Sequence, residues 1–361
     1  MSGVRAYAPL VATSTSRERA REHIARLCRG DMPVRQLRGA VLDQLRIAVG
    51  FDFYVFMLTD PRTCVGCDPL ADVPLLDELP RLIRLKYATS VNRWTTLNDP
   101  PVALLYEGTG GRREQSLLWR DMLAAADVVD VASAVFRDRF GCWGFLDLWR
   151  SEPGAPFTKA DADFLAAIAP AVTAALRSCQ ATTFTPNAGG VAVAGHDALV
   201  LLLTPELTIR AQTHQTGGYL RRLLPTPPER SPIPAAAYNV AAQLVAIEAG
   251  VDDHPPAASV HLDGGIWVTL RAARIGISEP GDIAVTIDHV APAERLEIFT
   301  RACALTAREG ELLIVLADGA DTRQAAEHMH LSVHTIQDHL KSIFNKTRSR
   351  SRRELLARAL G

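Results

Sequence analysis

Residues able to ligate a metal, exchange protons or contact DNA are concentrated in LSVHTIQDHLKSIFNK, which runs from Leu331 to Lys346. Two histidines, one aspartate and two lysines lie in these sixteen residues. His334 and His339 are five positions apart, so a helix would place them on different faces and they are not expected to share a metal ion. The remaining chemistry depends on which of these side chains a helix would bury.

The apolar residues of this stretch recur at the spacing of one helical face. Four of them fall at i, i+4, i+7 and i+8 and form the expected buried stripe: Ile336, Leu340, Ile343 and Phe344. The opposite side then carries polar side chains: His334, Thr335, Gln337, Asp338, Lys341 and Asn345. Amide and ammonium donors with a carboxylate acceptor suit base edges in the major groove of DNA. A solvated face of an ordinary helix would have the same spacing.

The charge near the C-terminus favours DNA. Between Lys341 and Arg358 the chain has seven cationic residues and one anionic residue, Glu354, whereas its overall net charge is -1. A local basic patch in a chain of balanced charge is typical of a surface that contacts phosphates.

The pattern after residue 304 predicts four helices, each with a polar residue at its start. They are expected over 305–319, 322–330, 332–347 and 351–360. Thr306 and Glu309 have the spacing of a capping box. The second and third helices are joined by a short turn, and this arrangement predicts a helix-turn-helix module.

The runs LTARE, LSVHTIQDHLKSIFNK and SRRELLARAL resemble the DNA-binding module of LuxR/FixJ-type regulators over nearly all of residues 305–361. The resemblance implies that the third helix enters the major groove of double-stranded DNA. It implies base contacts from Gln337, Asp338 and Lys341. Ser332 and Thr335 would contact phosphate with help from the basic tail, and the expected DNA-binding set also includes His334, Lys346 and Arg352.

The same resemblance implies a homodimer on an inverted repeat, with a seam on the last helix formed by Leu355, Leu356 and Ala359. Two residues depart from the family pattern. Gly310 lies inside the first helix, where glycine costs up to about 1 kcal/mol relative to alanine. Arg348 follows the third helix, where glycine is usual, so a left-handed cap there would be strained or built differently.

The length and composition indicate a multidomain α+β protein. The chain has 361 residues, of which 48% are hydrophobic and 22% charged, as in soluble globular proteins. Its apolar runs are shorter than the roughly 20 residues of a spanning helix, and no export signal is recognised, so a cytoplasmic location without membrane contact is expected. The six cysteines are expected to be free thiols: Cys28, Cys64, Cys67, Cys142, Cys179 and Cys303.

Residues 1–180 are expected to form a first sensor and dimerisation domain. A strand is predicted over 51–60, a helix over 117–128, a hairpin over 131–150 and a long helix capped by Thr158. The segment from Leu118 to Leu176 resembles the closing half of a GAF domain, a class that senses small molecules or redox state.

A ligand pocket in this domain would be lined by aromatic side chains and one cation: Trp94, Arg93, Trp143, Tyr87 and Tyr106. The alternative is that the aromatic residues pack the core. Cys142 beside Trp143 is either a redox switch or a structural thiol.

Residues 181–290 are expected to form a second domain that resembles a PAS domain, with a second GAF-like unit as the competing description. A linker over 180–195, a strand over 198–204, a Pro-rich crossing over 223–234 and a helix over 236–250 precede three strands. Residues 291–304 are predicted to form a helical linker to the helix-turn-helix domain at 305–361.

The sequence gives no support for a catalytic motif. The chain has no GxxxxGK[ST] or GxSxG sequence, and the CxxC at Cys64 and Cys67 lacks partners for a zinc site. We therefore expect no enzyme activity, catalytic residue, metal or cofactor. The sequence predicts a bacterial transcriptional regulator whose front domains sense a small-molecule or redox signal. The alternatives are a constitutive dimeric DNA-binding protein with vestigial sensor domains and an enzyme with a DNA-targeting tail.

Overall fold

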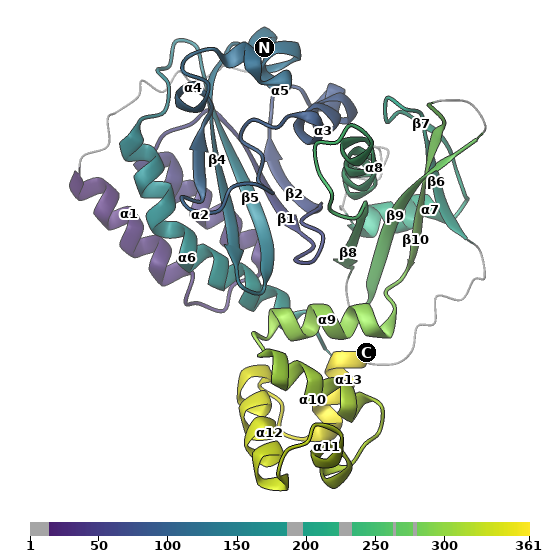
Figure 1. Cartoon of the computed structure of the whole chain (residues 1–361). Coiled ribbons are helices and arrows are strands. Elements are labelled where there is room, and N and C mark those ends of the chain that lie inside the picture. The colour runs from purple at the N-terminus through teal and green to yellow at the C-terminus, as the bar shows by residue number, and fades with distance from the viewer. Residues whose placement is uncertain (1–13, 186–197, 224–232, 263–264, 277–279) are drawn as a thin grey trace.

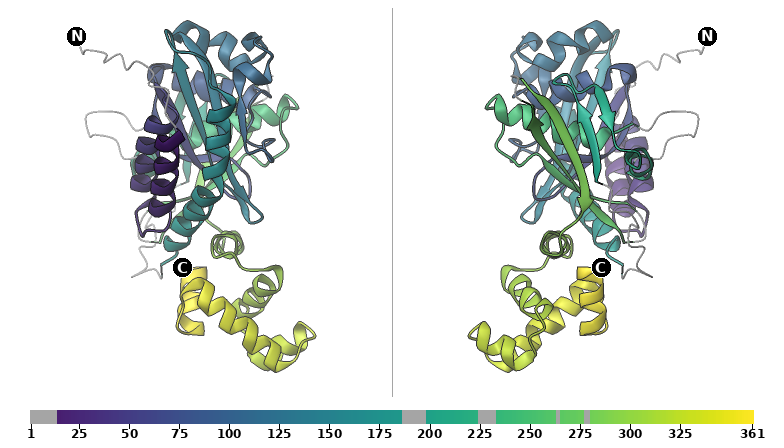
Figure 2. Two further views of the ribbon diagram at one scale, coloured as in Figure 1. Left: turned by 90° about the vertical axis from the view of Figure 1, so that its left-hand side faces the viewer. Right: turned by 90° about the vertical axis from the view of Figure 1, so that its right-hand side faces the viewer.

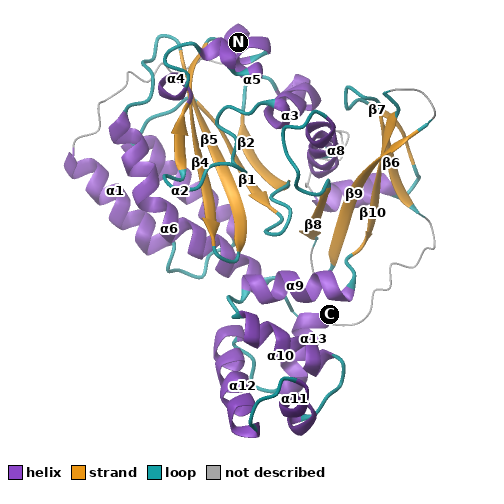
Figure 3. Ribbon diagram, in the orientation of Figure 1, coloured by secondary structure: helices purple, strands orange, loops and turns teal. Residues whose placement is uncertain are grey.

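The computed structural model describes residues 14–185, 198–223, 233–262, 265–276 and 280–361. Two antiparallel sheets lie side by side above a C-terminal helical domain (Figure 1, Figure 3). This arrangement confirms the multidomain α+β class. The predicted linker at 180–195 and the Pro-rich crossing at 223–234 fall largely outside the described residues.

The first sheet has five strands in the order β2-β1-β5-β4-β3. They are β1 (Phe53–Thr59), β2 (Gly66–Asp72), β3 (Val102–Leu104), β4 (Val128–Asp138) and β5 (Gly141–Ser151). The predicted strand at 51–60 and the predicted hairpin are confirmed as β1 and the β4–β5 pair. β2 and β3 were not predicted, since β2 contains Pro69 and two aspartates and β3 has three residues.

Three helices cover one face of this sheet: α1 (Ser14–Leu27), α2 (Val34–Ala48) and α6 (Lys159–Thr182) (Figure 1). The core between them includes Leu45, Phe56 and Val172, all fully buried. The predicted capping box at the start of α6 is present, with the Thr158 hydroxyl accepting from the amide of Asp161. By length and composition α6 is apolar enough to span a membrane, but it packs against β4 and α1 as a core helix does.

The other helices of this unit are short: α3 (Leu79–Ala88), α4 (Leu105–Gly108) and α5 (Leu117–Asp121), with 3-10 turns η1 (Leu76–Glu78), η2 (Arg113–Gln115) and η3 (Leu123–Ala126). The prediction of one helix over 117–128 is wrong. The chain leaves helical geometry at Met122, and Asp127 takes a left-handed conformation with φ 56°.

The second sheet has the order β7-β6-β10-β9-β8. Its strands are β6 (Leu199–Leu203), β7 (Ile209–Gln212), β8 (Ala257–His261), β9 (Trp267–Ile275) and β10 (Asp282–His289), and its helices are α7 (Thr216–Leu223) and α8 (Ala235–Glu248). Numbered from its own first strand, each sheet has the order 2-1-5-4-3. The two front units therefore share one sheet topology.

The helix α8 joins the two front units. Every residue from 235 to 243 is buried, because α8 packs on α3 and β2 of the first unit and on β9 of the second (Figure 1). A helix that is apolar on all sides is expected to lie inside a core. Met57 of β1 belongs to the same core as Val240 of α8, whereas its neighbour Phe56 points to the opposite face of the sheet.

The C-terminal domain is attached through α9 (Pro292–Ala302), which lies beneath both sheets (Figure 1). The domain itself consists of α10 (Ala307–Ala317), α11 (Thr322–His328), α12 (Val333–Thr347) and α13 (Arg352–Leu360). All four predicted helices are confirmed, with ends within a few residues of those expected.

Candidate nucleic-acid interface

Side-chain caps fix the start of each helix in the C-terminal domain. The predicted capping box of α10 is present, with Thr306 and Glu309 as its two members. Asp321 begins α11, Ser332 begins α12 and Ser351 begins α13, and each side chain accepts a hydrogen bond from an amide of the first turn. These caps set which residues of each helix face inward.

The predicted apolar stripe of α12 faces the core of the domain. Ile336 and Ile343 are fully buried, and Leu340 and Phe344 are partly buried against the same core. The helix packs on α10 and α11, as the second helix of a helix-turn-helix pair does.

The opposite side of α12 is open to solvent at the end of the molecule farthest from the two sheets (Figure 2). Five of the residues predicted to bind DNA are exposed there: Ser332, His334, Gln337, Asp338 and Lys341. A sixth, Thr335, is half-buried. His334 Nε2 and Asp338 Oδ2 are 3.7 Å apart, but both side chains are well solvated, so the pairing is weak. Their polar groups remain accessible to a ligand.

Lys346 has a different environment from the one predicted. Its ammonium group lies 2.6 Å from Oε2 of Glu309, whose carboxylate is buried and also accepts from the hydroxyl of Ser342 and the amide of Thr306. Burial raises the pKa of Glu309, but these hydrogen bonds outweigh burial and hold the pKa at about 2. The charge of Lys346 therefore balances an internal carboxylate, and its predicted contact with DNA stays a prediction.

Arg352 is also engaged inside the domain. Its Nη2 donates to the carbonyl of Leu316 at 3.2 Å and to that of Ala320 at 2.6 Å. These carbonyls lie at and just beyond the end of α10, where backbone acceptors lack helical partners. The guanidinium therefore caps α10, and the predicted contact of Arg352 with DNA stays a prediction.

The basic patch is smaller than the sequence indicates. Arg358 donates to the carbonyls of Phe184 and Thr347, so three of the seven cations between residues 341 and 358 are held by internal partners. The other four are exposed and form no ion pair among the residues that the structure describes: Lys341, Arg348, Arg350 and Arg353. We call these four side chains the outward cations.

The predicted dimer seam on α13 lies mainly inside the chain. Leu355 and Ala359 have no exposed surface, and Leu356 is half-buried. This correction has a direct cause, because α13 packs against α9 and α10 of its own chain.

Both departures from the LuxR/FixJ pattern have a structural account. A Cβ added at Gly310 would lie 3.0 Å from Cγ2 of Thr300, so glycine allows α9 and α10 to approach closely. Arg348 keeps the left-handed cap that glycine would provide, with φ 54° and ψ 32°.

Phe184 is the point where the three parts of the chain meet, and sequence reasoning did not identify it. Its ring stacks on Trp267 of β9 at 4.9 Å and meets Phe299 of α9 edge-on at 5.2 Å. Its carbonyl accepts from Arg358 Nε of α13 at 2.8 Å. Arg295 of α9 lies over the same ring, 5.1 Å from its centre.

The five residues predicted to line a ligand pocket do not surround a common space. Trp94 packs edge-on against Tyr87 at 4.8 Å, and both side chains are 1% exposed in the core shared with α8. Trp143 is buried on the opposite face of the sheet, in the core that includes α6. Tyr106 is 42% exposed. The aromatic residues thus have the packing roles of the alternative interpretation.

Arg93, the fifth of these residues, joins the two front units. Its guanidinium lies 2.6 Å from Oδ2 of Asp252, and both side chains are buried. It also donates to Oε1 of Gln243 on α8 and to the carbonyl of Tyr87. The cation is fully used by protein partners.

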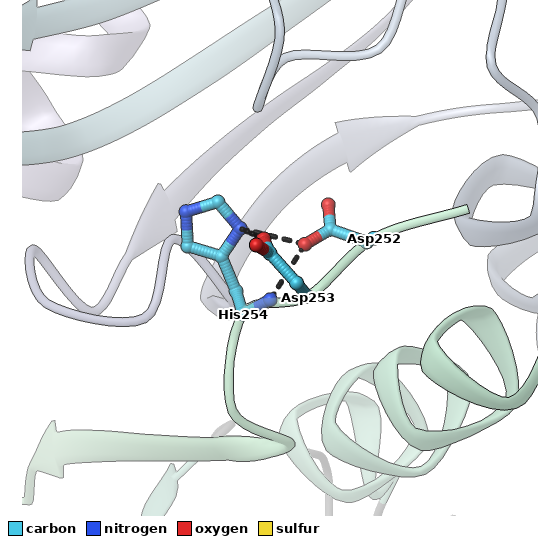
Figure 4. Close-up of side chains that lie close together, drawn as sticks. All are labelled: Asp252, Asp253 and His254. Carbon is cyan, nitrogen blue, oxygen red and sulfur yellow. Dashed lines mark hydrogen bonds and ion pairs between the residues drawn. The ribbon is translucent and has the colours of Figure 1, made fainter. Parts of the chain in front are cut away.

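The segment Asp252, Asp253 and His254 has three potential metal-ligand atoms within 4.8 Å of one another (Figure 4). The ring Nδ1 of His254 is 2.6 Å from Oδ1 of Asp252, and the side chain of Asp253 is fully exposed. Burial raises the pKa of Asp252, but hydrogen bonds from His254, Thr95 and Arg93 outweigh it and lower the pKa well below its ordinary value. Because Arg93 already neutralises Asp252, the segment acts as an interdomain hydrogen-bond network.

Comparison with known proteins identifies the C-terminal domain. Residues 303–359 match the family described as bacterial regulatory proteins, luxR family. No curated protein matches the chain. The four capped helices and the exposed face of α12 therefore belong to a LuxR-family helix-turn-helix domain, whose matched segment has 57 of the 361 residues.

Proposed function

We propose that this protein is a cytoplasmic, sequence-specific DNA-binding transcriptional regulator without enzyme activity. The observation that carries the proposal is the exposed polar face of α12 on a LuxR-family domain. In this proposal α12 lies in the major groove, with Gln337, Asp338 and Lys341 directed at base edges.

Phosphate contacts would come from the start of α12 and from the outward cations. The hydroxyls of Ser332 and Thr335 lie 2.9 Å apart at the helix N-terminus, where backbone amides also favour an anion. His334 is 84% exposed on the same turn. Lys346 and Arg352 have a supporting role in this proposal, since their charges are held by internal acceptors.

A homodimer would present two copies of α12 to the half-sites of an inverted repeat. Because Leu355 and Ala359 are buried within the chain, the proposed dimer uses surfaces other than these two side chains. The half-site spacing then depends on how each helix-turn-helix domain is held by α9 and Phe184.

The two front units would regulate this arrangement. Their shared strand order supports one common sensory architecture, either GAF-like and PAS-like or two copies of one type. Since α8 fills the space between the two sheets, a signal would act at the junctions between parts of the chain. The signal is a small molecule or a redox change.

The test is selection of bound fragments from genomic DNA of the source organism by the full-length protein, with Lys341→Ala and Lys159→Ala compared. Lys159 is an exposed lysine of α6, so its loss removes one positive charge far from α12. We expect one inverted-repeat motif with wild type and Lys159→Ala and a loss of about 1 to 3 kcal/mol in binding with Lys341→Ala. Equal retention of all sequences by the three proteins would refute sequence-specific readout.

A further inference from the structure

Two strand-connecting turns of the first unit contact each other beside α9. The first turn spans residues 60–65 between β1 and β2, and the second comprises residues 139–140 between β4 and β5 with the strand ends at 138 and 141–142. The amide of Cys142 donates to the carbonyl of Pro61 at 3.4 Å. Gly141 has φ 151°, and a Cβ there would collide with the same carbonyl, so the close approach of the turns requires glycine.

Each turn contributes one thiol to this contact. Cys64 and Cys142 are 7% and 1% exposed and belong to the same buried cluster. Cys142 lies opposite Arg137 across the β4–β5 pair. Arg137 Nη2 lies 3.9 Å from Sγ of Cys64. The two residues are 78 positions apart in the sequence, so the fold brings them together.

The backbone of Cys64 is held in an unusual conformation. Its φ is 59°, a left-handed value that is uncommon for residues other than glycine. Its amide donates to the carbonyl of Asp60 at 2.9 Å, and its own carbonyl accepts from Nε1 of Trp94 at 2.8 Å. Thr59 fixes the backbone of Cys142, because the Thr59 hydroxyl donates to the Cys142 carbonyl at 2.7 Å.

The environment of this pair differs from that of the other thiols. The neighbouring Cys64 thiol and the Arg137 guanidinium outweigh burial and lower the pKa of Cys142, while the pKa of Cys64 rises. Burial instead raises the pKa of Cys28 to about 11 and that of Cys303 to about 12, and it also raises the pKa of Cys179. Thiolates are the reactive form of cysteine, so the pair is favoured for oxidation.

Both turns are connected to the DNA-binding domain through α9. Arg62 of the first turn lies 3.9 Å from Glu294 and 3.8 Å from Glu297 of α9. Phe140 of the second turn accepts a hydrogen bond from Arg301 of α9 at 3.0 Å. A displacement of the two turns would therefore act directly on the helix that leads into α10.

The first turn also contacts the second front unit. Asp60 accepts from the amide of Ser259 at 2.8 Å, and the hydroxyl of Thr63 donates to the carbonyl of Ala257 at 2.6 Å. Ser259 and Ala257 both belong to β8, which pairs with β9. Trp267 of β9 in turn stacks on Phe184.

We propose that Cys64 and Cys142 are an oxidisable thiol pair that closes to a disulfide and changes the contacts of the two turns with α9. The proposal rests on the proposed function for its effect on DNA binding and deepens it by naming the signal as a hydroperoxide. Cys64 and Cys142 would then be the site at which the regulator is modified.

The reaction proceeds in two balanced steps. The Cys142 thiolate attacks one peroxide oxygen, the O–O bond breaks, and the leaving oxygen takes a proton, which gives a sulfenic acid and an alcohol or water. The sulfur of Cys64 then attacks the sulfenic sulfur, and the hydroxyl leaves with the thiol proton as water. The two thiols lose two electrons in total, and the hydroperoxide gains them.

Disulfide formation must move the turns, because an S–S bond is about 2.05 Å long and two non-bonded thiols are farther apart. The strained Cys64 and the close packing at Gly141 leave little room for local adjustment. We expect the contacts from Arg62 and Phe140 to α9 to weaken, so that the helix-turn-helix domain is less firmly positioned and binds DNA less tightly.

The experiment treats the reduced full-length protein with hydrogen peroxide, blocks free thiols and maps linked peptides without reduction. We expect a Cys64–Cys142 linkage before any modification of the more exposed Cys28 and Cys179. Cys64→Ser and Cys142→Ser abolish it, and Cys179→Ser is the matched control that retains it.

Affinity for selected DNA is measured on the same samples. We expect a fall of roughly 5- to 150-fold on oxidation, recovery on reduction, and no peroxide response in Cys142→Ser. Absence of the linkage in wild type, or earlier oxidation of Cys28 or Cys179, overturns the site. Linkage with unchanged affinity overturns the switch. Failure of the proposed function can be distinguished from failure of the thiol pair. If the proposed function is wrong, the reduced wild-type protein shows no sequence preference for DNA, while peptide mapping still shows whether Cys64 and Cys142 become linked.

Discussion

The ammonium group of Lys346 lies 2.6 Å from the carboxylate of Glu309, and this pair joins the first turn of α10 to the last turn of α12. The same carboxylate accepts from the amide of Thr306, so one side chain both caps α10 and positions α12. Its burial makes the ionised state of Glu309 a requirement for this arrangement.

Acid should destabilise the C-terminal domain through Glu309. Its pKa is about 2 in the folded protein, below the ordinary 4.5 expected when unfolded, so the stabilisation is complete above pH 4.5 and is lost as pH falls toward 2. The loss is about 3 kcal/mol by linkage. Urea unfolding at several pH values measures it, and Glu309→Gln should remove most of this dependence. An unchanged pH profile in Glu309→Gln would contradict the assigned pair.

Salt dependence of DNA binding separates the outward cations from the internal ones. Lys341→Ala should reduce the slope of log K against log salt by about one, because each phosphate contact releases condensed counterions. Arg352→Ala should leave the slope unchanged, because its guanidinium donates to carbonyls of α10. Titrations at four salt concentrations measure both slopes. If Arg352→Ala lowers the slope as much as Lys341→Ala does, Arg352 contacts phosphate and its role is not limited to capping α10.

Adjacent aspartates allow a test of the junction between the front units. Asp252→Asn leaves the buried guanidinium of Arg93 without its counterion and should lower the free energy of unfolding by about 3 kcal/mol or more. Asp253→Asn should change it by less than about 0.5 kcal/mol, because that side chain is fully exposed (Figure 4). Denaturant unfolding of residues 1–361 compares the two variants, and equal losses would show that the Arg93 pair is not the cause.

Local signals made the C-terminal domain predictable. Caps such as Thr306 and Ser332 and the apolar spacing from Ile336 to Phe344 depend on neighbours within one or two turns, and the structure confirms them. The hairpin of β4 and β5 was predictable for the same reason, since two apolar, strand-like runs flank a short turn.

The internal use of Lys346 and Arg352 was not predictable, because their partners lie 37 and 32 or more residues away. A charge count cannot distinguish a cation facing DNA from one balancing a buried carboxylate. The residues predicted to line a ligand pocket do not surround one space for a related reason. The helix α8, which belongs to the second unit, packs against β2 and α3, and its position is set by tertiary packing. Its unbroken run of buried residues from 235 to 243 explains why its sequence is mostly apolar, with Asn239 and Gln243 as buried polar exceptions.

Loss of the Phe184 ring should loosen the C-terminal domain from the front units. Phe184→Ala removes a fully buried ring that contacts Trp267 and Phe299, at a cost of about 3 to 5 kcal/mol. We expect faster amide hydrogen exchange in α9 and α13 and a smaller change in α12, because the ring's aromatic and cation contacts among the described residues are with Trp267, Phe299 and Arg295. Phe157→Ala, which opens a cavity in the first unit, is the control with a similar loss of stability. Equal acceleration of α13 in both variants would mean that general destabilisation, and not the Phe184 contact, controls how the DNA-binding domain is held.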